Sequence, residues 1–324
     1  MKRRIILHVL FSLALVATIL GRAPQATGAQ TVASGTVQAW GDNGSGQLGN
    51  GTMTRTECAC IPTPVSVSGL SGVTALASGD YHSLALLSDG TIRAWGDNAQ
   101  GQLGDGTMVA SATPVSVSGL SGVTAIAAGG LHSLALLRDG TVRAWGSNFS
   151  GQLGDGIGSD SATPVPVSGL SGVTALAGGY YHSLALLSDG TMRAWGYNYY
   201  GQLGTGTAPT GGCACIHTPV PVINLSGVTA IAAGGVHSLA LLGDGTIRSW
   251  GENSQGQLGV GTTTNSATPV PVSGLGGVTA IAGTTSAWRS WATAPSVTGA
   301  STATASWAPV RRAPISERRY RSPV

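Results

Sequence analysis

The stretch Trp95-Gly96-Asp97-Asn98-Ala99-Gln100-Gly101-Gln102-Leu103-Gly104 is one of five copies of the pattern W-G-x-N-x-x-G-Q-L-G. The copies are spaced by 55, 50, 50 and 55 residues, and they begin at Trp40, Trp95, Trp145, Trp195 and Trp250. A fixed period of about 50 residues is typical of propellers and solenoids, in which each repeat is one structural unit. We therefore interpret the five tryptophans as structural residues of the repeat.

The residues around each copy predict four short strands. In the unit from Gly122 to Ser171, an apolar run too short for a helix is followed by the strong hairpin turn Asp139-Gly140. Counted from that run, the strands are Leu134–Leu137, Thr141–Trp145, Thr163–Val167 and Val173–Ala177. A four-stranded antiparallel unit repeated radially is a propeller blade, so we predict an all-β propeller. A β-helix or another solenoid is the alternative, although its coils are shorter.

The tryptophan box, the His-Ser-Leu-Ala-Leu strand and the Asp-Gly turn together resemble the regulator of chromosome condensation repeat family over about residues 35–283. The resemblance implies a β-propeller, and members of that family usually close a ring of seven blades. This chain has five boxes and only four His-Ser-Leu strands. We therefore expect about five blades in an incomplete ring, whose exposed strand edges favour aggregation.

The amino terminus has the composition of an export signal. Lys2, Arg3 and Arg4 precede an apolar run from Ile5 to Leu20, and the small residues Thr27-Gly28-Ala29 suit cleavage before Gln30. We therefore assign residues 1–29 to a signal peptide and residues 30–283 to the propeller. An uncleaved anchor is the alternative. The expected product is an exported, bacterial-type protein that has no membrane association after cleavage.

The carboxyl terminus departs from the repeat after Gly283. Codons exist for Thr284–Pro295 that, read one nucleotide earlier, encode Tyr-His-Phe-Ser-Leu-Ala-Leu-Leu-Gly-Asp-Gly-Thr, which resembles the repeat's own strand and turn. Continued through Val310, the shifted frame can encode a further Trp-Gly and Gly-Gln-Leu-Gly. Our hypothesis is that residues 284–324 are a frameshifted sixth repeat, which we expect to be poorly ordered.

The charge of the repeat region argues against nucleic acid as a partner. Residues 30–283 hold 6 of the 16 Lys and Arg residues and 12 of the 13 Asp and Glu residues, which gives a net charge of −6. Nucleic-acid-binding proteins carry a basic surface instead, because phosphate contacts dominate their affinity.

Variation between the copies falls on one predicted rim of the propeller. The loops that enter each His-Ser-Leu strand and those that follow each Trp-Gly lie on the same rim, whereas the Asp-Gly turns and the Ser-Gly-Leu-Ser-Gly turns on the other rim barely change. Exposed aromatic residues are common anchors of protein interfaces. The candidate partner-binding residues on the varying rim are Tyr81, Phe149, Tyr180, Tyr181, Tyr197, Tyr199 and Tyr200. In the alternative interpretation, these rings pack locally over the loop backbone.

The histidines next to serines invite a Ser-His-Asp interpretation, which we reject. The histidines are His82, His132, His182 and His237, each followed directly by a serine. A catalytic triad is one asymmetric constellation, whereas this pair recurs in every blade, and neighbouring strand residues point to opposite faces. We interpret each histidine as a structural residue hydrogen-bonded to the backbone. We expect no catalytic residue, cofactor or metal.

Two Cys-x-Cys pairs, Cys58/Cys60 and Cys213/Cys215, lie in insertions before Thr-Pro-Val. Disulfides are the default in an exported protein. Bonds within each pair and bonds to a partner chain both remain open. Metal binding is the weaker option, because two thiols fall short of a four-ligand site.

These observations favour an exported, non-enzymatic scaffold that binds a protein through its variable rim. The family resemblance implies two further alternatives. One is guanine-nucleotide exchange on a small GTPase, and the other is inhibition of an extracytoplasmic enzyme such as a β-lactamase.

Overall fold

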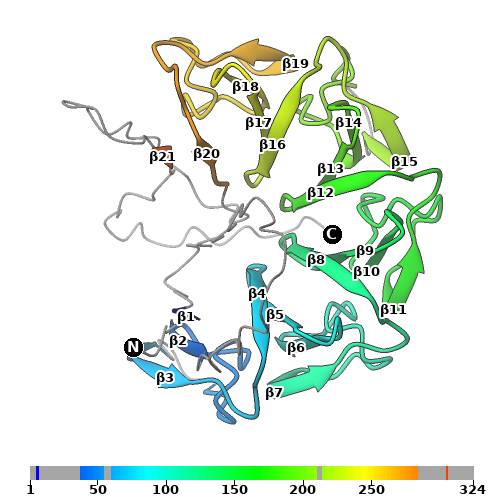
Figure 1. Ribbon diagram of the computed structural model, residues 1–324, viewed down its shortest axis with the longest axis vertical. Helices are drawn as coiled ribbons and strands as arrows, with labels where there is room; N and C mark the ends of the chain where they lie inside the picture. Colours follow the sequence, from blue (N-terminus) through cyan, green and yellow to red (C-terminus); the bar gives the residue numbers. More distant parts are fainter. Residues whose placement is uncertain (1–4, 7–36, 55–59, 210–213, 284–303, 306–324) are drawn as a thin grey trace, which may run out of the picture.

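The computed structural model describes residues 5–6, 37–54, 60–209, 214–283 and 304–305. Its strands form four complete four-stranded antiparallel sheets arranged around a common axis (Figure 1). In chain order, their strands are β4 (Val73–Ser78), β5 (His82–Leu87), β6 (Ile92–Gly96), β7 (Ser111–Ser116), β8 (Val123–Ala128), β9 (His132–Leu137), β10 (Val142–Gly146), β11 (Ser161–Pro166), β12 (Val173–Gly178), β13 (His182–Leu187), β14 (Met192–Tyr197), β15 (Cys215–Pro221), β16 (Val228–Ala233), β17 (His237–Leu242), β18 (Ile247–Gly251) and β19 (Ser266–Pro271).

Partial sheets stand at the two ends of the arc. The antiparallel pair β2 (Val37–Gly41) and β3 (Ile61–Ser66) supplies two strands of a first blade, and β1 (Ile5–Ile6) pairs with β2 in parallel. At the other end, β20 (Ala280–Ile281) follows the last complete blade and pairs in parallel with β21 (Thr304–Ala305). The arc does not close between β20 and β2 (Figure 1). The predicted all-β propeller with an incomplete ring is therefore confirmed.

The assignment of one strand to its blade differs from the prediction. Val173–Ala177 was predicted to be the fourth strand of the blade that holds Leu134–Leu137. It belongs instead to β12, which pairs with β13 and is the first, innermost strand of the next blade. In the sheet that contains Leu134–Leu137, the fourth strand is β8, which pairs with β9 across a short hairpin. The Ser168–Gly172 turn thus connects two blades, because it leads from an outer edge strand to an inner strand.

The outermost strand of each blade carries the prolines, as expected. Pro164 and Pro166 lie in β11, at the edge of its sheet. Proline lacks a backbone N–H and is therefore tolerated at a sheet edge, where one side of the strand is not paired.

The tryptophans join each blade to the one before it. Trp95, Trp145, Trp195 and Trp250 are fully buried, and Trp40 is also buried. The indole Nε1 of Trp145 donates to the carbonyl oxygen of Gln102 in the preceding blade at 2.9 Å, and the next two tryptophans repeat this bond at 2.8 and 2.9 Å. The hydrophobic clusters likewise combine side chains of adjacent blades, as when Leu84 and Ile92 share a core with Trp145. The box tryptophan is therefore a structural element between blades.

The repeated histidines also connect blades, but their partner is a side chain. His82, His132 and His182 do not bond to backbone as predicted: their Nε2 atoms lie 2.9, 2.8 and 3.0 Å from the hydroxyl of the serine on the next blade. That serine hydroxyl donates its proton to a glutamine carbonyl of the preceding blade, as Ser133 does to Gln102 at 2.8 Å. The hydroxyl oxygen is thus the acceptor, and the histidine Nε2–H is the donor.

Candidate functional site

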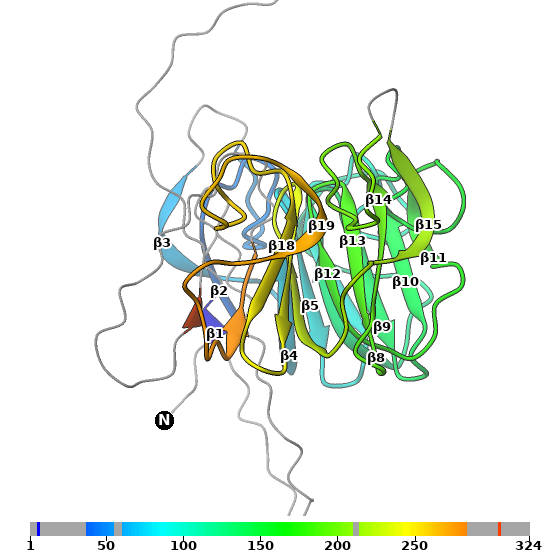
Figure 2. The same ribbon diagram turned by 90° about the horizontal axis from the view of Figure 1, so that it is seen from above.

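The two rims of the propeller are made by different connections. Within a blade, strands run between the rims, so the loop from the first to the second strand and the loop from the third to the fourth strand share one rim. We call this the variable rim. The Asp-Gly hairpin turns and the turns between blades form the opposite rim. Figure 2 shows the ring edge-on, with the strands running between these two rims.

Six of the seven predicted aromatic residues meet in one continuous group, which we call the aromatic cluster. Tyr181 is its centre: its ring contacts those of Phe149, Tyr180 and Tyr197 edge to face, at centroid distances of 5.1, 4.2 and 6.0 Å. Tyr197 in turn contacts the rings of Tyr199 and Tyr200, which also contact each other within the box loop of the fourth repeat. The members of the cluster are Phe149, Tyr180, Tyr181, Tyr197, Tyr199 and Tyr200.

The cluster is partly open to solvent. Phe149 is 56% exposed and Tyr199 is 46% exposed, while the other rings are more covered. Tyr81, on the second blade, is 44% exposed and lies outside these ring contacts, although it is near enough to contribute to the raised pKa of Tyr180, whose main cause is burial. Burial also raises the pKa of Tyr197 and of Tyr200. Their phenols are therefore neutral at physiological pH.

A glycine on the preceding blade leaves space for one ring of the cluster, because it has no side chain. A Cβ atom at Gly130 would lie 2.9 Å from Cδ2 of Tyr180, which is closer than such atoms approach in proteins. The two positions are equivalent in neighbouring repeats, so the small residue in one blade accommodates the large residue in the next. Tyr180 is thus packed against backbone on one side and against Tyr181 on the other.

Under the variable rim, each box holds a buried glutamine, whose hydrogen-bond partner depends on the residue that follows Trp-Gly. In three repeats that residue is acidic, and its carboxylate accepts a hydrogen bond from the glutamine Nε2. The distances are 3.1 Å from Gln47 to Asp42, 2.7 Å from Gln102 to Asp97 and 3.0 Å from Gln257 to Glu252. The acid therefore satisfies a donor that the fold buries.

The third and fourth repeats lack this acid. Ser147 and Tyr197 occupy its position, and the Nε2 atoms of Gln152 and Gln202 are buried without a hydrogen-bond partner among the described residues. The hydroxyl of Ser147 is in the same condition. These are the repeats whose box loops supply Phe149, Tyr197, Tyr199 and Tyr200 to the cluster. Sequence reasoning missed this coupling, although the acidic third box residue of the other copies was a usable signal.

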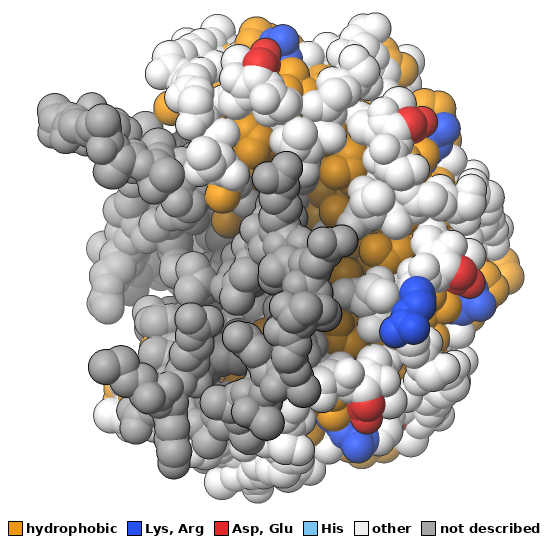
Figure 3. All heavy atoms as spheres, in the orientation of Figure 1, with side chains coloured by type: hydrophobic (Ala, Val, Ile, Leu, Met, Phe, Trp, Pro, Cys, Tyr) orange, Lys and Arg blue, Asp and Glu red, His pale blue; other side chains and the backbone are white. Residues whose placement is uncertain are grey.

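Charge is divided unequally between the rims. Among the described residues the variable rim has no Lys or Arg, and its seven carboxylates belong to Asp42, Asp80, Asp97, Asp105, Asp155, Asp160 and Glu252. The opposite rim carries Arg93, Arg138, Arg143, Arg193, Arg248, Asp89, Asp139, Asp189 and Asp244, a net charge of +1. Figure 3 views this opposite rim, where acidic and basic side chains lie side by side in one blade after another. Arg55 and Glu57 lie outside the described residues, and their opposite charges cancel.

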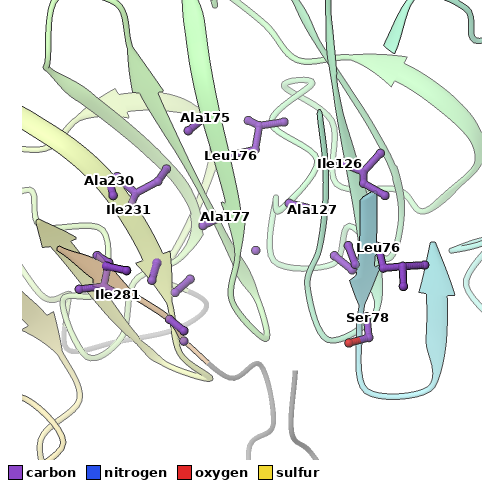
Figure 4. Close-up of a pocket in the computed structure, with 18 of the residues that line it drawn as sticks. Leu76, Ser78, Ile126, Ala127, Ala175, Leu176, Ala177, Ala230, Ile231 and Ile281 are labelled. Atoms are coloured by element: carbon purple, nitrogen blue, oxygen red, sulfur yellow. The ribbon is translucent and has the colours of Figure 1, made fainter. Parts of the chain in front are cut away.

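A cavity of about 190 Å³ lies at the axis, between the innermost strands. The residues that line it include Leu76, Ile126, Leu176, Ile231 and Ile281, which come from β4, β8, β12, β16 and β20 (Figure 4). None of the described residues that line it has a titratable side chain, and the hydroxyl groups among them belong to Ser78, Thr229 and Thr279.

The recurring histidines and serines are also poorly placed for catalysis. Burial lowers the pKa of His132 and His182 to about 3 and that of His82 and His237 to about 4, so all four are neutral in the folded protein at pH 7. Each serine hydroxyl is buried, and its proton is used on a backbone carbonyl.

The cysteines are only partly described. Cys215 is disulfide-bonded and Cys60 is half-buried, whereas Cys58 and Cys213 lie outside the described residues. The described residues include no group of three or more His, Cys, Asp or Glu that could hold a metal ion. Nor does any helix within them have the length and apolar character needed to cross a membrane.

The family model described as an RCC1-like domain matches residues 23–288, which is most of the chain. The chain belongs to this RCC1-like family. The predicted relationship to the regulator of chromosome condensation repeats is therefore confirmed.

The curated relatives match short segments of the chain. Protein RCC2 homolog of Danio rerio is 39% identical over 75 residues, which is 23% of this chain and 14% of that protein. Protein pim1 of Schizosaccharomyces pombe is 42% identical over 72 residues, or 22% and 13% of the two chains. The E3 ubiquitin-protein ligase HERC2 of Homo sapiens is 40% identical over 79 residues, which is 24% of this chain and 2% of that protein.

Solved structures match a larger part of the chain. Human WBSCR16 is 26% identical with a TM-score of 0.63, covering 72% of this chain and 61% of that one. Yeast RCC1 (Prp20), solved bound to Kap60, is 27% identical with a TM-score of 0.60, covering 67% and 52%. A second Prp20p structure from Saccharomyces cerevisiae is described with binding to Gsp1p and histones. The chain thus spans about half the length of these relatives.

Proposed function

We propose that this chain is an exported, non-enzymatic propeller that binds a protein partner through its variable rim, with the aromatic cluster at the centre of the interface. The observation that carries the proposal is the coincidence under the cluster. The two repeats that contribute most of its rings are the two in which the buried glutamine has lost its carboxylate partner. A departure from the repeat that leaves buried donors unsatisfied is expected at a functional site.

The exposure of the rings supports the same proposal. Aromatic side chains that are half open to solvent and gathered on one rim are typical anchors of protein interfaces, because they bury a large area at low entropic cost. Members of the RCC1-like group bind proteins, as the complex of yeast RCC1 with Kap60 illustrates. The identity of the partner is a separate question, since the chain spans only part of these relatives.

Export is proposed from the amino-terminal pattern of basic residues, apolar run and small residues. Amino-terminal sequencing of protein recovered from the extracytoplasmic fraction tests it. A mature chain that begins at Gln30 supports cleavage, and a chain that retains residues 1–29 contradicts it.

Guanine-nucleotide exchange is the second candidate, because the RCC1-like group includes a protein studied for its binding to Gsp1p. The assay is release of a fluorescent guanine nucleotide from a small GTPase in the presence of the full chain. Release no faster than the intrinsic rate removes this candidate and leaves the binding proposal unchanged.

The binding proposal is tested with the double variant Tyr199→Ser/Tyr200→Ser in the full chain. Proteins of the extracytoplasmic fraction are captured by cross-linking and compared between wild type and variant. Val109→Ser is the matched control, because Val109 is a 71% exposed apolar residue of the same rim outside the cluster. We expect the double variant to lose its partner while Tm stays unchanged. A marked fall in Tm would instead support local packing of the rings and count against the proposal.

A further inference from the structure

We propose that the partner segment that docks on the aromatic cluster is basic, with Lys or Arg side chains lying over the exposed rings and paired with the carboxylates of the variable rim. This inference rests on the proposed protein-binding function and specifies the chemistry of the partner. It predicts a property that the presence of an aromatic interface alone does not require, namely dependence on the partner's positive charge.

The first argument is the separation of charge between the rims. Every described Arg lies toward the opposite rim, where the guanidinium groups are near the turn aspartates. The hydrogen bonds from Thr141 are the main cause of the lowered pKa of Asp139, for example, and the charge of Arg143 contributes to it. The variable rim retains only carboxylates among its described charges. A surface of one sign raises the local concentration of an oppositely charged partner and repels partners of its own sign.

The second argument is the position of the carboxylates on both sides of the cluster. Burial is the main cause of the raised pKa values of Tyr81 and Tyr180; the charges of Asp80, Asp42 and Asp97 raise the pKa of Tyr81 further, and Asp80 does the same to Tyr180, so these carboxylates lie near the two hydroxyls. On the far side, Glu252 acts on Tyr200. The cluster therefore lies between two acidic groups, and an extended segment crossing it would pass both.

The third argument is the chemistry of the rings. Phe149 and Tyr199 are about half exposed, and the raised pKa values of Tyr180, Tyr197 and Tyr200 keep those phenols neutral, so these rings present π faces without a competing charge. A Lys ammonium or an Arg guanidinium is attracted to such a face, and the attraction is stronger with Arg. An acidic partner would be repelled by the flanking carboxylates.

The fourth argument indicates a peptide rather than a small cation. The Nε2 donors of Gln152 and Gln202 are fully buried, lack a partner among the described residues, and in the sister repeats are aimed at the residue that follows Trp-Gly. In the fourth repeat this residue is Tyr197 of the cluster. Because these two donors are buried, a partner reaches them only when the box loop above them shifts; a peptide backbone then brings carbonyl acceptors together with its cationic side chains, directly or through a bridging water. An isolated amine or metal cation brings no acceptor.

The test uses the full chain and fluorescein-labelled peptides of six Gly-Arg, six Gly-Glu or six Gly-citrulline units, with binding followed by fluorescence anisotropy. Citrulline keeps the shape of Arg and removes its charge. We expect the Gly-Arg peptide to bind, its affinity to fall as NaCl is raised, and the other two peptides to bind much more weakly. Equal binding of the Arg and citrulline peptides overturns the inference.

Variants separate the site from the general charge of the protein. Tyr199→Ser and Glu252→Gln are each expected to weaken Gly-Arg binding by about two- to fivefold, the effect of one exposed cation–π or charge contact. Glu252→Gln keeps an oxygen that can accept from Gln257. Asp189→Asn, which removes a charge from the opposite rim, is the matched control and should change nothing. An equal loss with Asp189→Asn would mean non-specific attraction and would contradict the inference.

The same variants distinguish failure of this inference from failure of the proposed function. A protein partner that is lost with Tyr199→Ser, yet is indifferent to Glu252→Gln and to salt, would overturn the basic-segment inference and leave the binding function intact. A partner that is retained with Tyr199→Ser would overturn both.

Discussion

Replacing Asp97 with Ser should reproduce, in the second repeat, the condition found under the aromatic cluster. Asp97 accepts a 2.7 Å hydrogen bond from Nε2 of Gln102, which is fully buried. Without that acceptor, the amide donor is left unsatisfied, at a cost of about 1–3 kcal/mol in the free energy of unfolding. For a domain of this size, a loss of about 2 kcal/mol lowers Tm by roughly 4–8 °C.

The measurement is thermal and urea unfolding of the full chain beside two companions. Asp97→Asn keeps an acceptor oxygen for Gln102 and should lose much less stability than Asp97→Ser. The reciprocal change Ser147→Asp supplies the missing carboxylate to Gln152 and should raise the free energy of unfolding by up to about 1 kcal/mol, since the buried position also costs desolvation. Equal destabilisation by Asp97→Ser and Asp97→Asn would refute the reasoning, because the hydrogen bond would then contribute nothing.

Three further outcomes follow from the same structure. Trp145→Phe removes the indole bond to the Gln102 carbonyl and should cost about 1–3 kcal/mol, measured by urea unfolding; an unchanged midpoint would contradict its role between blades. The four buried histidines, whose pKa values are lowered from 6.5 to about 3 or 4, stay neutral while those of the unfolded chain take up protons. Stability should therefore be complete above pH 6.5 and fall toward pH 4 by up to about 1.4 kcal/mol per pH unit for each histidine, whereas a flat pH profile would exclude the burial. Tyr199→Ser/Tyr200→Ser should abolish partner capture at unchanged Tm, as set out above.

The fold could be predicted because it is repeated. One copy of Trp-Gly-x-Asn would have been a weak signal, but five copies in register determine the unit, the turn and the class. The point in the repeat at which one blade ends and the next begins could not be obtained in this way, because a periodic sequence has no marked beginning. Val173 follows β11 closely along the chain, and only the pairing of β12 with β13 shows that it starts a new sheet.

The rim and the residues of the candidate site were chosen from the sequence, because copy-to-copy variation concentrates in loops that the scaffold positions, and their role in binding stays a prediction. Contact between the rings was beyond the sequence, because it depends on side-chain directions and on Gly130, which leaves room for Tyr180 in the adjacent blade. The partner of His132 was also mistaken for backbone. Its true acceptor, Ser183, is 51 residues away, and the spacing alone does not show that both side chains meet between two sheets.

The residue after Trp-Gly connects the stability of the blade with the proposed binding function. An acid at this position serves the scaffold, because it satisfies the buried glutamine, whereas Tyr197 contributes a ring to the surface and leaves Gln202 without that bond. Two such losses on adjacent blades, at about 1–3 kcal/mol each, are large beside a typical net stability of about 5–15 kcal/mol. The edge-to-face contacts within the cluster offset part of this cost, at about 0.5–1.5 kcal/mol a pair. The remainder would be offset if binding shifts the box loops and the proposed partner then supplies the missing acceptors, so the exception to the repeat, rather than the repeat itself, marks the candidate site.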